Sequence, residues 1–286
     1  MKRFLAFDVG GTTIKYGVVA EDRSITHRGV VSTDHNADGA ILKQLLRVTR
    51  ALQTKLALAG VGVSTAGIVG ADGAIQYAGP TIPNYQGTPL KATLAEVSGK
   101  PTHVVNDVAA ALLSEQIAGA AQGIASVYCV ALGTGIGGAY YHNGELLQGT
   151  HGTANSLGYL LYDGASKTTY EQRAATLRLQ AQLQPQGISV IEAFARAKAG
   201  DAAMMAVLQS WAATVASGLA PIVLLLDPAV LVLGGAVSQQ GQYLLDLIAP
   251  ELDRLLPEGL RQTQLRVAAL GNDAQLIGAV TPFLKK

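Results

Sequence analysis

The chain has 286 residues, of which 49% are hydrophobic and 14% are charged. This balance excludes a disordered protein, and the length suits one large domain or two of ordinary size. The formal net charge of +1 provides no field that would attract nucleic acid or an anionic membrane surface. We therefore expect a small-molecule ligand, with neither nucleic acid nor a membrane as partner.

Cysteine occurs once, at Cys129 within an apolar run, so a single chain can build neither a disulfide nor a cysteine zinc site. Met1 to Arg3 are basic, but Asp8 and a glycine turn interrupt the next apolar stretch before a signal-peptide core is complete. The longest apolar tract, around Leu219 to Leu226, is shorter than the roughly 20 residues that span a bilayer. We expect a cytoplasmic protein.

The first predicted element is a strand over 4–7, which enters the turn Asp8-Val9-Gly10-Gly11-Thr12-Thr13-Ile14-Lys15 and is followed by a second strand over 16–20. Because glycine lacks Cβ, the backbone N–H groups of such a turn can approach an anion closely, and threonine hydroxyls add donors. We therefore predict that Gly10, Gly11, Thr12 and Thr13 bind phosphate.

Two charged residues flank this turn. Asp8 is better placed to orient a magnesium-bound water than to contact phosphate, because two anions repel each other. Lys15 has two open roles, as a phosphate ligand and as a solvated surface charge.

Further along, helical spacing of apolar residues predicts a surface helix over 41–52, and an apolar run predicts a buried strand over 58–63. The turn 64–67 follows that strand, and ligands of open α/β sheets bind at such carboxyl ends. Asp107 lies at the next junction, between a strand and a predicted helix. Its role is open: the local sequence favours an N-cap, while a carboxylate there is also the best candidate for a general base.

A second glycine turn, Gly133 to Gly138, lies between predicted strands over 127–132 and 139–141. Gly133, Thr134, Gly135, Gly137 and Gly138 are candidate phosphate ligands on the same grounds. After a segment that is hard to assign, an amphipathic helix runs from about Met204, and Pro221 is expected to kink or restart it. A buried strand over 230–233 then opens into Gly234-Gly235, and a final helix covers about 273–284.

Strands and helices alternate, which predicts an α/β protein. Each half begins with a strand, a glycine turn, a strand and a polar turn, so we predict a duplicated fold of two lobes with nucleotide held in the cleft between them. The lobes are assigned to 1–107 and 108–286, and the last helix, about 273–286, is expected to pack back on the N-terminal lobe.

Six short motifs occur in a specific order: Asp8 to Lys15, Ser64 to Gly67, Asn106-Asp107, Gly133 to Gly138, Val232 to Gly235 and Leu270 to Ala274. In this order they resemble the ROK family of bacterial sugar kinases and sugar-responsive repressors, over essentially the whole chain. The resemblance implies an actin-like, hexokinase-like (ribonuclease H-like) fold of two α/β lobes. It also implies transfer of the γ-phosphate of ATP, with Mg, to a sugar hydroxyl, commonly the 6-hydroxyl of a hexose.

The resemblance assigns roles to particular residues. Asp107 becomes the general base, Asn106 hydrogen-bonds sugar hydroxyls, and the turn at Gly67 lines the sugar pocket. The two glycine turns hold phosphates, and Gly234-Gly235 lies by the adenosine. The family also suggests a homodimer.

Three positions depart from the family pattern. Thr81 replaces the usual asparagine of a sugar-binding loop, Ser156 replaces a glutamate that contacts the sugar near its anomeric end, and Tyr159 replaces a zinc-binding histidine. The three cysteines that bind this zinc in relatives are absent too, so no zinc is expected, as in a branch that includes β-glucoside kinases. The loss of the carboxylate leaves three readings: a substituted or larger sugar, weakened sugar binding, or replacement by a neighbour such as Glu171.

The leading hypothesis is therefore an ATP-dependent kinase acting on a hexose, a hexose derivative or a β-glucoside. The alternative is a sugar-binding regulatory or catalytically weak protein without a DNA-binding domain, because the first strand starts almost at Met1. A dinucleotide-dependent oxidoreductase fits poorly, since both glycine turns run into strands rather than helices.

Overall fold

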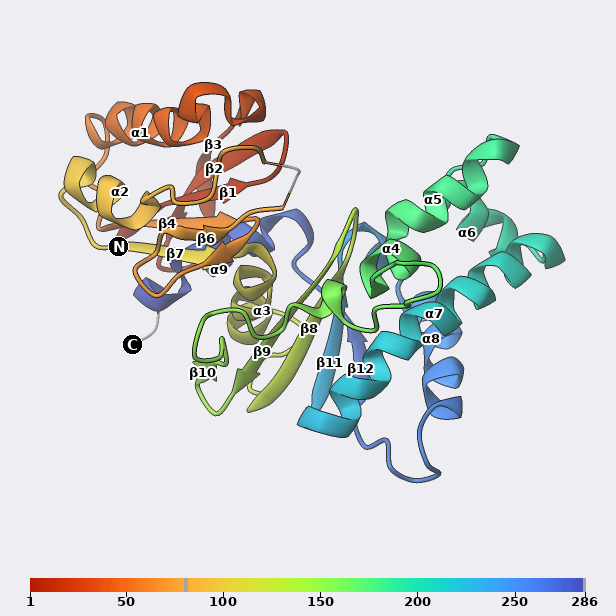
Figure 1. Cartoon of the computed structure of the whole chain (residues 1–286). Coiled ribbons are helices and arrows are strands. Elements are labelled where there is room, and N and C mark those ends of the chain that lie inside the picture. The colour runs from red at the N-terminus through yellow and green to blue at the C-terminus, as the bar shows by residue number, and fades with distance from the viewer. Residues whose placement is uncertain (80–81, 285–286) are drawn as a thin grey trace. The chain divides into compact units, whose positions relative to one another are not determined.

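The computed structural model describes residues 1–79 and 82–284 (Figure 1). The chain forms two compact units. Unit 1 comprises Met1–Ile117, Gln148–Ala154 and the chain from Asn272, and unit 2 comprises Ala118–Leu147 and Asn155–Gly271. This division differs from the expected boundary at residue 107, because the helix after Asn106 and a short later segment both belong to unit 1. Thr81 lies outside the described residues.

Unit 1 is built on a five-stranded sheet with the order β3-β2-β1-β4-β7. The first three strands are antiparallel, and β4 and β7 are parallel to β1. The strands are β1 (Arg3–Val9), β2 (Thr13–Ala20), β3 (Ile25–Ser32), β4 (Gly60–Thr65) and β7 (Thr102–Asn106), with a separate hairpin of β5 (Ile68–Val69) and β6 (Ile75–Tyr77).

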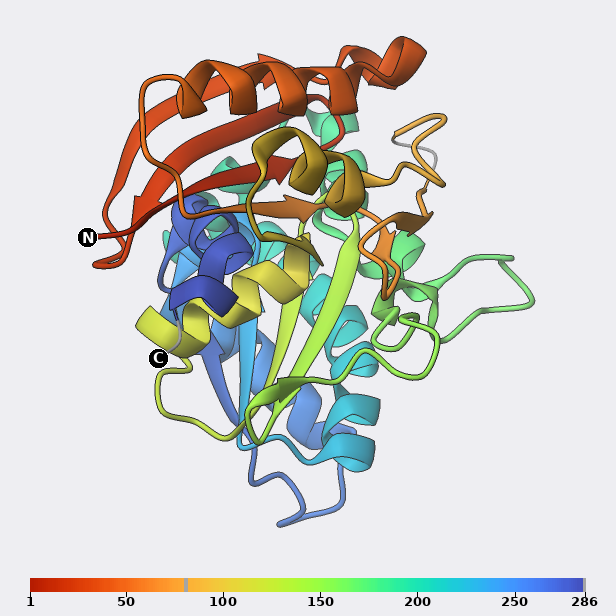
Figure 2. The ribbon, with the colours of Figure 1, turned by 90° about the vertical axis from the view of Figure 1, so that its left-hand side faces the viewer.

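Helices cover both faces of this sheet, as Figure 2 shows. Because side chains alternate along a strand, Leu5 and Phe7 of β1 face the core shared with α1 and α2, whereas Phe4 and Ala6 face α9. Phe4 stacks on Phe283 with the ring centroids 5.4 Å apart. The helices of unit 1 are α1 (Ala40–Gln53), α2 (Leu90–Ser98), α3 (Asp107–Ala118) and α9 (Ala274–Leu284).

Unit 2 repeats this topology with a second five-stranded sheet, ordered β10-β9-β8-β11-β12. Here β9 is antiparallel to β8, and β11 and β12 extend the sheet in parallel. The predicted duplication is confirmed, because each glycine turn joins the equivalent pair of strands. The strands are β8 (Ser126–Leu132), β9 (Ile136–His142), β10 (Glu145–Leu146), β11 (Val230–Gly234) and β12 (Gln264–Val267), and the helices are α4 (Tyr170–Ala174), α5 (Thr176–Leu183), α6 (Val190–Lys198), α7 (Ala202–Leu226) and α8 (Gln242–Arg254).

The helix α7 is long and apolar enough to cross a membrane by length and composition, but it packs as a core helix of unit 2. The Trp211 indole N–H donates to the Ala174 carbonyl at 2.9 Å, and the Tyr170 hydroxyl donates to the Val215 carbonyl at 2.7 Å. The expected restart at Pro221 is wrong, since one helix runs from Ala202 to Leu226. Burial of the residues on either side of Pro221 offsets the cost of about 3 kcal/mol of a proline within a helix.

Candidate functional site

The carboxyl ends of three parallel strands of unit 1 carry the polar residues of the candidate site. The strand register places Asp8 of β1 beside Ser64 of β4, and Thr65 of β4 beside Asn106 of β7. These ends lie side by side because a parallel sheet aligns its strand directions, which also explains why ligands bind there. The ends of β1, β4 and β7 therefore bring Asp8, Ser64 and Asn106 to one edge of the sheet.

Asp8 is a partly buried carboxylate with two polar neighbours. The Ser64 hydroxyl donates to Asp8 Oδ1 at 3.4 Å, and the antiparallel register places Lys15 directly opposite Asp8. Burial raises the pKa of Asp8, while the Lys15 charge and the Ser64 hydrogen bond act in the other direction. The Lys15 charge therefore acts on the Asp8 carboxylate, an interaction that the sequence position of Lys15 did not reveal.

The helix α3 begins directly after β7, and Asn106 caps it. Asn106 Oδ1 accepts the backbone N–H groups of Val108 and Ala109 at 2.9 and 3.2 Å. Asn106 Nδ2 donates to the carbonyl of Gly67 at 2.9 Å, which ties the turn after β4 to the start of α3. The N-cap role that the local sequence favoured for Asp107 thus falls mainly to its neighbour.

Asp107 is partly buried at the first position of α3, where its Oδ1 accepts the N–H of Val108 at 2.9 Å. Burial, together with the negative charge of Asp8, raises the pKa of Asp107 to about 6. A carboxylate with a pKa close to neutral can accept a proton from an attacking hydroxyl and later release it. This is the strongest chemical feature of unit 1.

The first glycine turn is a tight connection between β1 and β2, closed by a hydrogen bond from Gly10 N–H to the Thr13 carbonyl at 3.0 Å. Thr33, at the end of β3, holds it from outside: its hydroxyl donates to the Gly11 carbonyl at 2.9 Å and its N–H donates to the Thr12 carbonyl at 3.0 Å. With these carbonyls engaged and the threonine side chains of the turn exposed, donors remain for an anion. No local sequence signal marked Thr33.

Of the predicted second glycine turn, Gly133 to Gly135 join β8 to β9, and the Gly133 N–H donates to the Gly135 carbonyl at 3.0 Å. Gly137 and Gly138 lie within β9 instead, where they pair with β8. Glu171 of α4 supports the turn, since its Oε2 accepts the N–H of Ile136 at 2.7 Å. A Cβ on Gly135 would lie 2.5 Å from Glu171 Oε2, and one on Gly158 would lie 2.9 Å from it. The carboxylate considered above as a substitute sugar ligand is thus engaged with the backbone of the turn.

The pair Gly234-Gly235 ends β11, beside the end of β8 in the register. Gly235 has φ +89°, and a Cβ there would lie 2.1 Å from the Leu132 carbonyl oxygen. Both its conformation and this close approach require glycine. Within unit 2, the second and third glycine segments therefore come together at one sheet edge.

The remaining predicted sugar-site residues are divided between the units. Gly67, with φ +96°, belongs to unit 1 together with Asn106 and Asp107. Ser156 and Tyr159 belong to unit 2, where Ser156 precedes a 3₁₀ turn and the side chain of Tyr159 is 58% exposed. Across residues 1–79 and 82–284, no group of three or more His, Cys, Asp or Glu side chains is arranged to hold a metal ion.

Comparison with known proteins gives a consistent set of relatives. A family model described as ROK family matches residues 4–286. A beta-glucoside kinase of Listeria monocytogenes is 29% identical over 299 residues, which cover 99% of this chain and 98% of the relative.

Two solved structures agree with this match. The ROK family glucokinase from Streptomyces griseus in complex with glucose and AMPPNP is 30% identical, has a TM-score of 0.81 and is aligned over 97% of each chain. A ROK family protein from Streptococcus pneumoniae in complex with sucrose is 26% identical, has a TM-score of 0.85 and is aligned over 99% of this chain and 98% of its own. The expected fold class, a duplicated α/β fold of the actin-like and hexokinase-like type, is confirmed.

Proposed function

The chain belongs to the ROK family, and from this membership and the site chemistry we propose that it is an ATP-dependent sugar kinase. The acceptor is a hydroxyl, the 6-hydroxyl by analogy, of a hexose, a hexose derivative or a β-glucoside. Relatives that are a glucokinase and a beta-glucoside kinase support the reaction class, and the nucleotide analogue bound to one of them supports ATP as donor.

The observation that carries the proposal is the carboxylate of Asp107, with its pKa raised to about 6 at the carboxyl edge of the unit 1 sheet. As the sugar oxygen attacks the γ-phosphorus, its proton passes to Asp107 and the bond from that phosphorus to the bridging oxygen of ADP breaks. General base catalysis of this kind typically contributes about 10² to 10⁴ in rate. Asp107 is already oriented by the N–H of Val108.

The two glycine turns supply the phosphate ligands in this proposal, with Gly234-Gly235 next to the adenosine. Phosphoryl transfer mainly requires positioning and neutralised charge, for which backbone donors and a cation suffice. We propose that Asp8 orients a water bound to the Mg²⁺ of ATP. Its carboxylate is partly buried, and the nearby Asp107 adds a second negative charge, so a cation is favoured beside them. Magnesium would add positive charge beside both carboxylates, of which only Asp8 already has a cation, Lys15, opposite it.

Asn106 is proposed mainly to hold the Gly67 turn and the start of α3 in place. Its amide oxygen already accepts two N–H groups and one amide hydrogen is donated to Gly67, which leaves one N–H for a sugar hydroxyl. Ser156 and Tyr159 are proposed as further sugar ligands, and no zinc is required because Tyr159 stands at the position of the zinc-binding histidine. Stoichiometric zinc in the purified protein would contradict this point.

A panel of sugars tests the proposal by ADP release: glucose, mannose, N-acetylated hexoses and β-glucosides, each with ATP and Mg²⁺. We expect turnover with at least one of them, and no turnover with any would contradict the kinase assignment. Ser156 in place of a carboxylate favours a second candidate, a sugar-binding protein with weak catalysis. Calorimetric sugar binding without ADP release would identify that candidate.

Two further proposals concern the molecule in the cell. The family suggests a homodimer, which light scattering tests as a mass of twice the 29.5 kDa chain. We also propose a cytoplasmic location, where ATP is available. Fractionation of cells that express the protein tests it.

A further inference from the structure

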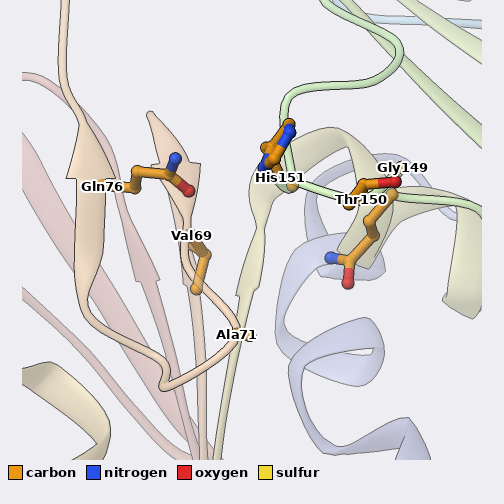
Figure 3. A pocket seen from close by; sticks show the side chains of 8 residues that line it. Val69, Ala71, Gln76, Gly149, Thr150 and His151 are labelled. Atoms are coloured by element: carbon orange, nitrogen blue, oxygen red, sulfur yellow. The ribbon is translucent and has the colours of Figure 1, made fainter.

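A pocket lies in unit 1 between the β5–β6 hairpin and the loop 148–152 (Figure 3). Its volume is about 250 Å³. This lies below the range of about 300 to 1,000 Å³ that is typical of whole drug-sized ligands, so it suits one ring of a larger molecule. The lining residues are Val69, Ala71, Gln76, Gln148, Gly149, Thr150, His151 and Gly152.

The loop that forms one wall has a defined shape. Gly149 and Gly152 both have positive φ, of +74° and +71°, and Gly152 N–H donates to the Gly149 carbonyl at 3.3 Å. A Cβ on Gly152 would lie 3.3 Å from the Val69 carbonyl oxygen, so the loop packs closely on β5. The hydrogen bond from Ala154 N–H to the Gln148 carbonyl, at 3.1 Å, closes the loop at its other end.

The chemistry of the lining is that of a carbohydrate site. Gln76, Gln148, Thr150 and His151 bring amide, hydroxyl and imidazole groups to the lining, and Figure 3 shows Gln76 on the hairpin facing the loop that carries His151. Within the described part of the chain these four polar side chains have no hydrogen-bond partner. Amides and hydroxyls can both donate and accept, as a ring with several hydroxyls requires. Lysine and arginine are absent from the lining residues, which disfavours a phosphate ligand.

The pocket is connected to the proposed acceptor site by a short path within unit 1. Asn106, next to Asp107, donates to the carbonyl of Gly67, and Val69 in the pocket lies two residues after Gly67. Strand β5, which carries Val69, also packs against β7, which ends at Asn106. A sugar whose hydroxyl reaches Asp107 can therefore direct its far end toward the pocket.

We propose that this pocket binds the second ring of the acceptor, so that the preferred substrate is a disaccharide or glycoside rather than a free hexose. The inference rests on the proposed function and specifies its substrate class. The polar side chains of the lining, Gln76, Gln148, Thr150 and His151, contact the hydroxyls of the second ring.

Two probes separate the rings: methyl β-glucopyranoside carries the first ring alone, and cellobiose adds a second ring at the same position. Their dissociation constants are measured by calorimetry on the full chain, without turnover. We expect wild type to bind cellobiose more tightly, and Gln76→Ala and His151→Ala each to weaken cellobiose binding about 3- to 10-fold, as loss of a hydrogen bond to a neutral ligand group does. Methyl β-glucopyranoside binding should change less than 2-fold, within measurement scatter.

Gln53→Ala, at another exposed glutamine, at the end of α1, is the matched control and should change neither constant. Cellobiose bound no more tightly than methyl β-glucopyranoside by wild type, or equal losses for both probes in the two variants, would overturn the inference. ADP release is measured separately. Two-ring selectivity without ADP release would contradict the kinase proposal alone and leave the pocket assignment standing.

Discussion

At the scale of single residues, Asp107 is the group whose environment departs most clearly from that of a surface carboxylate. Its partner Asn106 takes the capping bonds, and burial beside Asp8 raises the pKa of Asp107 to about 6. A residue relieved of a mainly structural task and held with a near-neutral pKa is suited to proton transfer.

The first prediction concerns pH. If Asp107 must be ionised to accept the proton, kcat/KM should fall at low pH with an apparent pKa near 6. Rates measured from about pH 5 to about pH 8, with magnesium and ATP saturating, bracket this value. A profile that stays flat down to pH 5, roughly one unit below that pKa, would contradict the assignment of the base.

The same shift makes a prediction about stability. The pKa of Asp107 rises from 3.8 to about 6 on folding, so the native state binds more protons than the unfolded state between these values. The free energy of unfolding therefore falls as pH rises through this range, and the loss is complete above the folded pKa. Asp107→Asn, which stays neutral, should be about 1 to 3 kcal/mol more stable than wild type at pH 7 and nearly equal to it below pH 4. Chemical denaturation at both pH values measures the difference, and a variant less stable at pH 7 would contradict the assigned cost of ionisation.

At the scale of elements, the strand end after β11 depends on backbone geometry that no other residue type supplies. Gly235 combines a positive φ with contact against the Leu132 carbonyl, at the end of the strand that leads into the second turn. Gly235 therefore packs directly against the end of β8, where the second glycine turn begins.

Gly235→Ala should lower the free energy of unfolding by about 2 to 4 kcal/mol and weaken ATP binding, because the Cβ displaces the end of β8. Gly187→Ala is the matched control: Gly187 also has positive φ, of +67°, but its Cβ would meet no atom within 4 Å. We expect the control to lose about 1 kcal/mol and to keep its ATP affinity. Chemical denaturation and nucleotide titration of both variants measure these losses. Equal losses of stability and of ATP affinity in the two variants would contradict the importance of the Gly235–Leu132 contact.

At the scale of the whole molecule, unit 1 is assembled from three separate stretches of chain, and α9 completes it. Helix α9 approaches α3 closely at Gly278, which is on α9, and approaches β4 closely at Gly62, which is on β4. A Cβ on Gly278 would lie 1.8 Å from the Ala110 carbonyl oxygen of α3, and a Cβ on Gly62 would lie 2.4 Å from the Ala279 carbonyl oxygen. The C-terminal helix therefore supports both the sheet and the helix that begins with Asp107.

Gly278→Ala tests this role. The added Cβ must push α9 away from α3, which we expect to cost about 2 kcal/mol or more of unfolding free energy and to reduce kcat through displacement of α3. Gly99→Ala, at an open position of unit 1 with φ +64°, is the control and should lose about 1 kcal/mol with kcat unchanged. Wild-type stability and kcat in Gly278→Ala would contradict the close crossing.

Local patterns predicted much of this architecture. The two strand–glycine–strand segments, the helix α1 and the buried strands β4 and β11 follow from short-range periodicity and appear where expected. Pro221 does not restart the helix, because packing on both sides outweighs its local penalty. Asn106 and Asp107 have similar capping propensity, so only the fold decides which of them caps α3.

Other features depend on contacts between distant residues, which no local pattern contains. The support of the second glycine turn by Glu171 joins residues 35 positions apart, and the packing of Gly152 on Val69 spans a longer stretch still. The pocket between the hairpin and the loop 148–152 therefore emerges from the fold alone.

The most direct test of the central claim is phosphoryl transfer by Asp107→Asn with the best sugar of the panel, measured as single-turnover ADP formation. The account predicts that transfer slows by about 10² to 10⁴, while the dissociation constants of sugar and ATP change by less than about 3-fold. Transfer at the wild-type rate in a variant that still binds both ligands would contradict the assignment of Asp107 as the base.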